Sequence, residues 1–280
     1  MTGAQFVRDT FTGNSGVLLE AHTGQTGAVW RKRVGPLDST AVLTLDGASG
    51  AVTTATSSAT FWYTSATPTS ADYQVSVDVT PGASGGDTEA GPTLRCDPNS
   101  HRVQYALVPT TGAFALVRWN FGGTILGSVT LSGGAVASET YRLTIDAAGS
   151  TIRGRVQRLS TLDYLTSAGA WTVSESWCVT VTDTVLTAAG RAGLTTGGDT
   201  ANVGTRLSNY RAGTDLTDAD PATGASWRTL TSISREHREW AQDARLRGLE
   251  ACPYDGQPLT TGAPQAPAVR HCPFCGRGFA

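Results

Sequence analysis

The stretch "YQVSVDV", residues 73–79, decides the fold class of this chain. Hydrophobic and polar residues alternate strictly along it. Because successive side chains of a β-strand point to opposite faces, this alternation predicts a strand with one apolar face. The apolar positions are Tyr73, Val75, Val77 and Val79.

Two predicted hairpins extend this pattern along the chain. Residues 141–157, "YRLTIDAAGSTIRGRVQ", form one, and its expected inward residues are Leu143, Ile145, Ile152 and Val156. "HRVQYALV" (101–108) and "GAFALVRW" (112–119) form another, joined at Pro109 to Gly112. More than ten such runs follow one another up to about Arg211, with no helical period among them. The chain is therefore predicted to be mainly β, an antiparallel sandwich.

The composition limits the class of protein. Hydrophobic residues make up 39% of the 280 residues, which suffices for a packed core, and charged residues only 16%. Thr, Ser, Gly and Ala are abundant, which is typical of all-β extracellular or virion proteins. The net charge of −2 indicates no basic face for nucleic acid. The first residues show no signal peptide, and the longest apolar stretch, from Ala106, is too short to span a membrane.

The first strands carry a recognisable series of motifs. In "RDTFTGNSGVLLEAHTGQTGAVW" (8–30) an Asp-Thr-Phe strand precedes a Gly-x-x-Leu turn, a His-Thr pair and a Gly-x-x-Trp strand. This opening resembles the concanavalin A-like jelly-roll domains of tailed-phage virion proteins, and "VGTRLSNYRAG" (203–213) is similar to their closing strand. The resemblance implies a domain over 1–213 whose first and last strands pair in one sheet. It implies little about function, because this fold serves lectins, glucanases and inert spacers alike.

The composition changes after the predicted sandwich. Residues 214–225 are polar, contain Pro221 and Gly224, and are predicted to be a linker. Residues 226–249 predict an amphipathic helix, and Gly248 near its end is a natural stop signal. One stripe of this helix is expected to pack against another part of the chain or against another subunit, and we call it the docking helix. The stripe contains Leu230, Ile233, His237 and Trp240.

The last segment, 250–280, has the spacing of a zinc ribbon. Cys252 and Asp255 form one turn, and Cys272 and Cys275 form a second after sixteen residues. Three thiolates and a carboxylate can hold a tetrahedral Zn²⁺, so we expect one structural zinc per chain, with His271 as the alternative fourth ligand. Five cysteines, three of them clustered here, favour a metal over a disulfide framework. The alternative is a pair of turns that folds without metal.

The chain end also resembles known virion proteins. Those of actinobacterial phages often end in a charged helix followed by a Cys-Pro-x-Asp-Gly turn and a Cys-Pro-Phe turn. Together with the opening motifs, this implies a structural protein of a tailed-phage particle, a minor tail or tail-tip component. A capsid decoration or head-fibre protein is the alternative. The expected partners are other virion proteins and further copies of the chain itself, and the expected location is the virion.

Catalysis is not expected from this sequence. No strand carries the Glu-x-Asp-x-x-Glu pattern that places two carboxylates around a glycosidic bond. Carbohydrate binding to a host surface is the competing function, with aromatic rings as stacking platforms. The candidate rings are Trp62, Tyr63, Tyr105, Trp119, Tyr164, Trp171 and Trp177. A calcium-assisted sugar site would use Asp97 and Asn99.

Overall fold

The chain divides into two compact units, Met1–Leu216 and Thr217–Ala280. A computed structural model describes residues 5–32, 42–55, 60–82, 90–97, 103–110, 112–120, 122–131, 136, 139–196, 204–214 and 216, and the strand residues 260–261, 270–271 and 278–279. The predicted domain limits at 213 and 225 remain a prediction.

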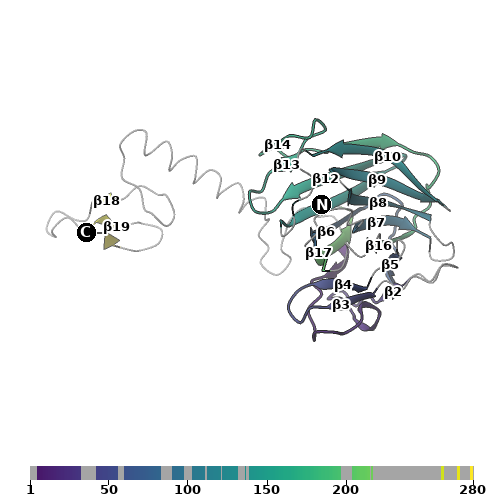
Figure 1. The fold of residues 1–280 in the computed structure, drawn as a ribbon, viewed down its shortest axis with the longest axis horizontal. Helices are drawn as coiled ribbons and strands as arrows, with labels where there is room; N and C mark the ends of the chain where they lie inside the picture. The colour runs from purple at the N-terminus through teal and green to yellow at the C-terminus, as the bar shows by residue number, and fades with distance from the viewer. Residues whose placement is uncertain are drawn as a thin grey trace. The chain divides into compact units, whose positions relative to one another are not determined.

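The first unit consists of two antiparallel sheets (Figure 1). The ten-stranded sheet contains β1 (Gln5–Asp9), β3 (Val42–Leu45), β4 (Ala51–Ala55), β6 (Gln74–Thr80), β11 (Tyr141–Ala148), β12 (Thr151–Arg158), β13 (Tyr164–Leu165), β14 (Trp171–Thr172), β15 (Val179–Thr182) and β17 (Arg206–Gly213). The seven-stranded sheet runs in the order β10 (Gly123–Thr130), β9 (Ala113–Asn120), β8 (Val103–Thr110), β7 (Gly91–Cys96), β16 (Arg191–Thr196), β5 (Thr60–Thr64) and β2 (Trp30–Lys32). A short 3₁₀ helix, Leu19–Ala21, precedes β2. The predicted mainly-β sandwich is confirmed.

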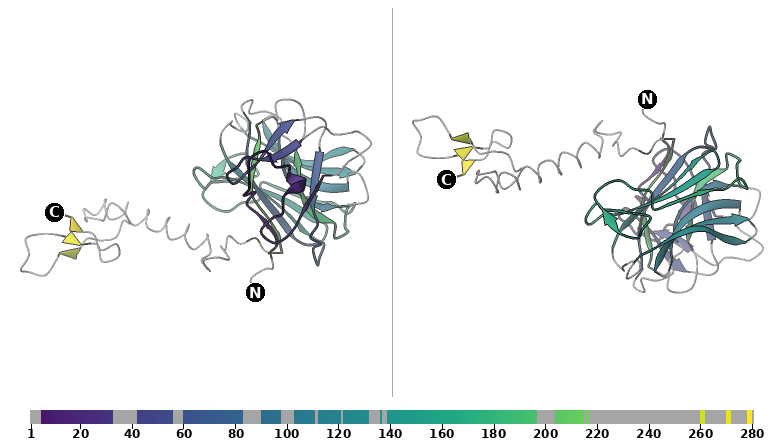
Figure 2. Two further views of the ribbon diagram at one scale, coloured as in Figure 1. Left: turned by 90° about the horizontal axis from the view of Figure 1, so that it is seen from below. Right: turned by 90° about the horizontal axis from the view of Figure 1, so that it is seen from above.

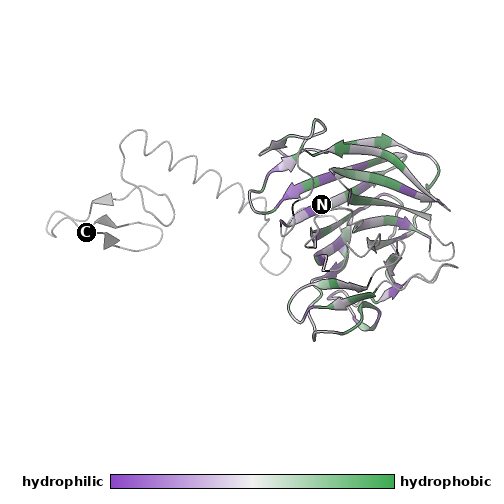
Figure 3. Ribbon diagram, in the orientation of Figure 1, coloured by the Kyte–Doolittle hydropathy of each residue, from purple (hydrophilic) through white to green (hydrophobic). Residues whose placement is uncertain are grey.

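Apolar side chains from both sheets meet between them. In and just before β6, Tyr73, Val75, Val77 and Val79 are all buried in this core. The β11–β12 hairpin forms as predicted and buries Leu143, Ile145, Ile152 and Val156. Figure 3 shows hydrophobic residues along the strands of both sheets. The period-two pattern of the sequence thus identified the inward face of these strands correctly.

The polar face of β6 is also buried, on the outer side of the ten-stranded sheet. Asp78 is 1% exposed, because Arg142 of β11 binds its carboxylate through Nε at 2.7 Å and Nη2 at 3.1 Å. Asn209 Nδ2 donates a third hydrogen bond to Asp78 at 2.8 Å. The negative charge of Asp78 on this face is therefore neutralised by the arginine side chain that lies beside it.

The opening motifs converge on one buried carboxylate. Asp9 accepts hydrogen bonds from the main-chain N–H of Phe11 at 2.7 Å and from Trp30 Nε1 at 2.6 Å. His22 Nε2 lies 2.9 Å from its Oδ1 atom. A β-carbon at Gly24 would lie 2.9 Å from the main-chain oxygen of Arg8 and 3.0 Å from Asp9 Oδ2, so this position favours glycine. We call Asp9, Phe11, His22 and Trp30 the Asp9 network.

The first and last strands of the sandwich pair as the resemblance implied. β1 lies antiparallel to β17, with Arg8 opposite Arg211 and Asp9 opposite Tyr210. Figure 2 shows the sandwich from two further sides. The predicted β8–β9 hairpin is also present, but Pro109 was expected in the turn and instead belongs to β8, which runs to Thr110. Gly112, just before β9, has a φ of +70°. A positive φ favours glycine, so this residue type suits the turn.

The second unit contains a small three-stranded sheet. Its strands are β18 (Thr260–Thr261), β19 (Arg270–His271) and β20 (Gly278–Phe279), in the order β18-β19-β20. The docking helix lies outside the described residues, as do Cys252, Asp255, Cys272 and Cys275. Among the described residues, no helix has the length and apolar character needed to cross a membrane.

Candidate binding face

Strands β8 and β9 are apolar on both faces. Tyr105, Leu107, Phe114 and Leu116 belong to the core between the sheets. The residues that alternate with them form a second buried cluster on the outer face of the seven-stranded sheet, with Trp119 packed against it. The members of that cluster are Ala106, Val108, Ala115 and Val117. Their exposed fractions are only 0–8%, so this outer face is already largely covered within the chain itself, except where the cavity described next opens.

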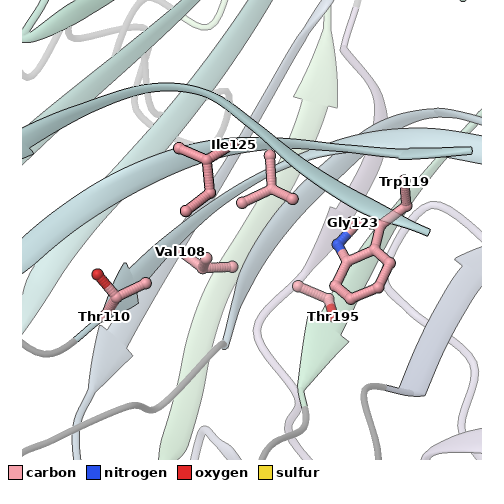
Figure 4. Close-up of a pocket in the computed structure, with 7 residues that line it drawn as sticks. Val108, Thr110, Trp119, Gly123, Ile125 and Thr195 are labelled. Carbon is pink, nitrogen blue, oxygen red and sulfur yellow. The ribbon is translucent and has the colours of Figure 1, made fainter.

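A cavity of about 180 Å³ lies on this outer face (Figure 4). Its walls come from four strands, β8, β9, β10 and β16. The lining residues are Val108, Thr110, Val117, Trp119, Gly123, Ile125 and Thr195. Cavities for drug-sized ligands measure roughly 300–1,000 Å³, so this one suits a single small ring or substituent.

The indole ring of Trp119 forms one end of the cavity. It lies across the edge glycine of the neighbouring strand, since a β-carbon at Gly123 would be 3.2 Å from the ring. Phe61 packs its edge against the indole, with ring centroids 5.6 Å apart. Ile125, 64% exposed, stands at the rim. Trp119 is thereby held in place while part of its ring stays accessible.

Two threonines supply the polar atoms of the cavity. Thr195 Oγ1 donates to the main-chain carbonyl of Thr60 at 3.3 Å, and Thr110 Oγ1 donates to that of Ala113 at 3.3 Å. Each hydroxyl proton is engaged, so each oxygen presents only acceptor lone pairs to a ligand. No lining residue carries a charge. The cavity is therefore suited to a neutral ligand with an apolar face and hydrogen-bond donors.

An ion pair on the core side anchors the strand that carries Trp119. Arg118 Nη1 binds Asp183, whose Oδ1 also accepts hydrogen bonds from Tyr105 Oη at 2.8 Å and the N–H of Val185 at 2.9 Å. Burial acts to raise the pKa of Asp183, but the hydrogen bonds from Val185 and Tyr105 and the charge of Arg118 together lower it. Burial and the adjacent Asp183 raise the pKa of Tyr105 to about 12. Asp183 thus stays ionised and Tyr105 protonated near neutral pH.

The structure separates the seven aromatic candidates into three groups. Trp62 and Tyr105 are fully buried in the core. The prediction that these two rings could serve as stacking platforms was therefore wrong. Trp119 and Tyr63 lie on the outer face of the seven-stranded sheet, and Arg191 covers the Tyr63 ring at 5.7 Å. Only Trp119 lines the cavity. The remaining three are Tyr164, Trp171 and Trp177, and all of them belong to the other sheet or its loops.

Arginines contact all three of these rings, and Arg155 lies 5.8 Å from the ring centre of Tyr164. The guanidinium groups of Arg153 and Arg155 lie 4.4 and 4.9 Å from the Trp177 ring centre, and Arg158 lies 4.1 Å from that of Trp171. Arg153 also pairs with Asp146, and Arg155 with Glu175. Two of the arginines that contact these rings thus also pair with carboxylates. We interpret this arrangement as structural, because it holds the rings in place.

The structure leaves the predicted metal sites as predictions. Among the described residues, no three His, Cys, Asp or Glu side chains are grouped to hold a metal ion. Asn99, one half of the proposed calcium site, lies outside the described residues, as do the four expected zinc ligands. The main chain of His271, the alternative ligand, pairs with Thr260 and Gly278 in the small sheet.

Comparison with known proteins yields similarity in structure alone. No protein-family model and no curated protein sequence matches the chain. The exoplasmic/lumenal domain of VIP36, in a form that holds Ca²⁺ and Man2, superposes with a TM-score of 0.48 and 10% identity over 75% of this chain and 91% of that one. The carbohydrate-binding module CBM66 from Bacillus subtilis gives 0.45 and 14% over 66% and 94%. A glycosyl hydrolase family protein from Mycobacterium fortuitum gives 0.44 and 12% over 75% and 99%. Similarities this low carry no argument about ligands or activity.

The sequence contained a signal for the cavity that the period-two interpretation missed. "YALV" (105–108) and "FALV" (114–117) are continuous apolar runs, and such runs indicate strands covered on both faces. The other residues that line the cavity could not be predicted from apolar runs. Ile125 and Thr195 come from strands whose position beside β8 and β9 depends on the tertiary fold.

Proposed function

We propose that this chain is a non-enzymatic component of a tailed-phage particle, a minor tail or tail-tip protein, whose sandwich binds a host-surface carbohydrate. The single observation behind the binding role is the uncharged cavity at Trp119. The particle location rests on the resemblance of residues 8–30 and 203–213 to phage virion domains and on that of the chain end to virion proteins.

The chemistry of the cavity favours a sugar. One face of a pyranose ring carries mainly C–H groups and stacks on an indole, while its hydroxyl groups donate hydrogen bonds. Trp119 offers the ring surface, and the hydroxyl oxygens of Thr110 and Thr195 offer the acceptors. A charged ligand would lose its hydration without gaining a counter-ion here, so we expect neutral sugars to be preferred.

Binding without turnover is consistent with the lining of the cavity. Hydrolysis of a glycosidic bond by a pair of carboxylic acids needs the two groups about 5–9.5 Å apart around the sugar. None of the described residues that line the cavity is a carboxylic acid. Nearby, Asp183 is engaged by Arg118 and Tyr105 on the core side of the sheet.

A glycan array with the full-length protein tests the binding role. We expect a restricted set of neutral glycans to bind, and calorimetry of the best one to show at least tenfold weaker binding for Trp119→Ala. Tenfold corresponds to about 1.4 kcal/mol, within the range for one aromatic contact. Trp177→Ala, the same change in a loop of the other sheet, is the control and should leave the affinity unaltered. No bound glycan, or equal losses in both variants, would refute the binding role.

The particle location needs a separate measurement. Mass spectrometry and cryo-EM of purified particles should find the chain as a stoichiometric tail component. In this proposal the docking helix and the zinc-stabilised end attach the chain to its neighbours in the particle. A chain that is absent from particles would refute the location without affecting the result of the array. Finding the chain on the head would select the capsid-decoration alternative.

A further inference from the structure

Strand β10 forms a long edge of the seven-stranded sheet (Figure 1). Among the described residues it pairs only with β9, so the main-chain N–H and C=O groups on its other side have no strand partner there. It is eight residues long, whereas β2 at the opposite edge has three. A long edge is a template for pairing with another chain.

The sequence of β10 lacks the usual protection of such an edge. No charged residue and no proline occurs between Arg118 and Glu139. Natural edge strands are commonly defended by lysine or proline. Two features restrict this edge. The register shifts between Ile125 and Gly127, and Gly169 lies so close to the Thr130 main-chain oxygen that a β-carbon there would be 2.2 Å from it. Between these two points the pairing with β9 is regular.

The side chains on β10 are suited to contact with a partner. Ile125 is 64% exposed, and Ser128 and Thr130 are exposed beyond it. Small and uncharged residues allow a second strand to approach without desolvating a charge. The edge strand β2 differs, because it carries Arg31 and Lys32 in its three residues.

We propose that two copies of this chain associate by antiparallel pairing of β10 with β10, which joins their seven-stranded sheets into one. The uncharged strand meets its own copy without like-charge repulsion. A β10–β2 contact would offer less than half the pairing length. The β10–β10 contact is related by a two-fold axis and closes at two copies, so it does not lead to filaments.

This pairing also has a consequence for binding, which rests on the proposed function. Gly123 and Ile125 of β10 line the cavity, so the cavities of two copies would lie close to the shared edge on one continuous sheet. Two sites on a rigid pair raise the avidity for a surface that carries many glycans by roughly 10²–10⁴. The pairing itself does not depend on the identity of the ligand.

Sedimentation velocity of the full-length protein over a concentration series tests the proposal. We expect a species of twice the mass of one chain, and hydrogen exchange should show slowed amides at 123–130 in that species. Ser128→Lys places two like charges near the two-fold axis and should shift the protein toward the monomer. Thr161→Lys adds the same charge at an exposed turn and should leave the assembly unaltered.

The outcomes separate cleanly. Larger assemblies formed through the second unit would leave the β10 test intact, because Ser128→Lys should still halve their mass and expose the β10 amides. A wild-type monomer at every soluble concentration would overturn the proposal. An assembly that survives Ser128→Lys with unprotected β10 amides would overturn it as well. The exchange measurement on wild type needs no variant, so a misfolded Ser128→Lys protein would not leave the question open.

Discussion

Replacing Asp9 with alanine is the most informative single test of the sandwich. The carboxylate is fully buried and accepts hydrogen bonds from the N–H of Phe11 and from Trp30 Nε1, at 2.7 and 2.6 Å. Alanine would leave both buried donors without an acceptor. Each such donor costs about 1–3 kcal/mol, which puts the loss of folding free energy near 4 kcal/mol.

Thermal and urea unfolding followed by tryptophan fluorescence would measure this loss. For a domain of about 200 residues, 1 kcal/mol lowers Tm by about 2–4 °C, so Asp9→Ala should lower it by about 8–16 °C. Asp9→Asn keeps one acceptor oxygen and should fall between the wild type and Asp9→Ala. The matched control is Asp163→Ala, because the Asp163 carboxylate has no hydrogen bond among the described residues; its effect should stay within about 0.5 kcal/mol.

The result that would refute this reasoning is equally specific. If Asp9→Ala unfolds within about 1 kcal/mol of the wild type, the donors of the Asp9 network find other partners or water. The opening motif would then be a coincidence of composition. If the control loses as much stability as Asp9→Ala, the loss reflects removal of a carboxylate in general and not of the buried network.

Three further predictions follow from the described residues and the sequence. The pKa of Asp183 is lowered on folding, so the carboxylate's contribution, about 1–3 kcal/mol, is present above the unfolded pKa of about 3.9. Asp183→Asn should therefore be less stable than wild type at pH 7, and the gap should close as the pH falls below about 4; a constant gap in urea titrations from pH 2 to 7 would contradict this. A β-carbon at Gly91 would lie 2.0 Å from a main-chain carbonyl oxygen of β8. Gly91→Ala should thus cost about 2 kcal/mol or more in urea unfolding, whereas Gly122→Ala, with open space around it, should cost little; equal costs would argue against the close approach. Elemental analysis should find about one zinc ion per chain, lost in Cys275→Ser while the sandwich stays folded; a metal-free wild type with an ordered chain end would exclude the zinc site.

The sequence was sufficient for the class of fold because strand patterns are local. The alternation in β6 and in the β11–β12 hairpin depends only on neighbouring residues, and it named the inward side chains correctly. The pairing of β1 with β17 followed from resemblance. No local pattern links residues two hundred positions apart, so periodicity alone could not have predicted that pair.

The binding face was decided by tertiary structure. Strand β5 has three consecutive aromatic residues, Phe61, Trp62 and Tyr63, and a run without alternation does not show which ring faces the core. Only the packing of the two sheets buries Trp62 and leaves Tyr63 on the outer face. Trp119 became a candidate site residue because β10 and β16 bring Ile125 and Thr195 beside it. Strand order in a sheet is set by long-range pairing, and a single sequence does not contain that order in any local pattern.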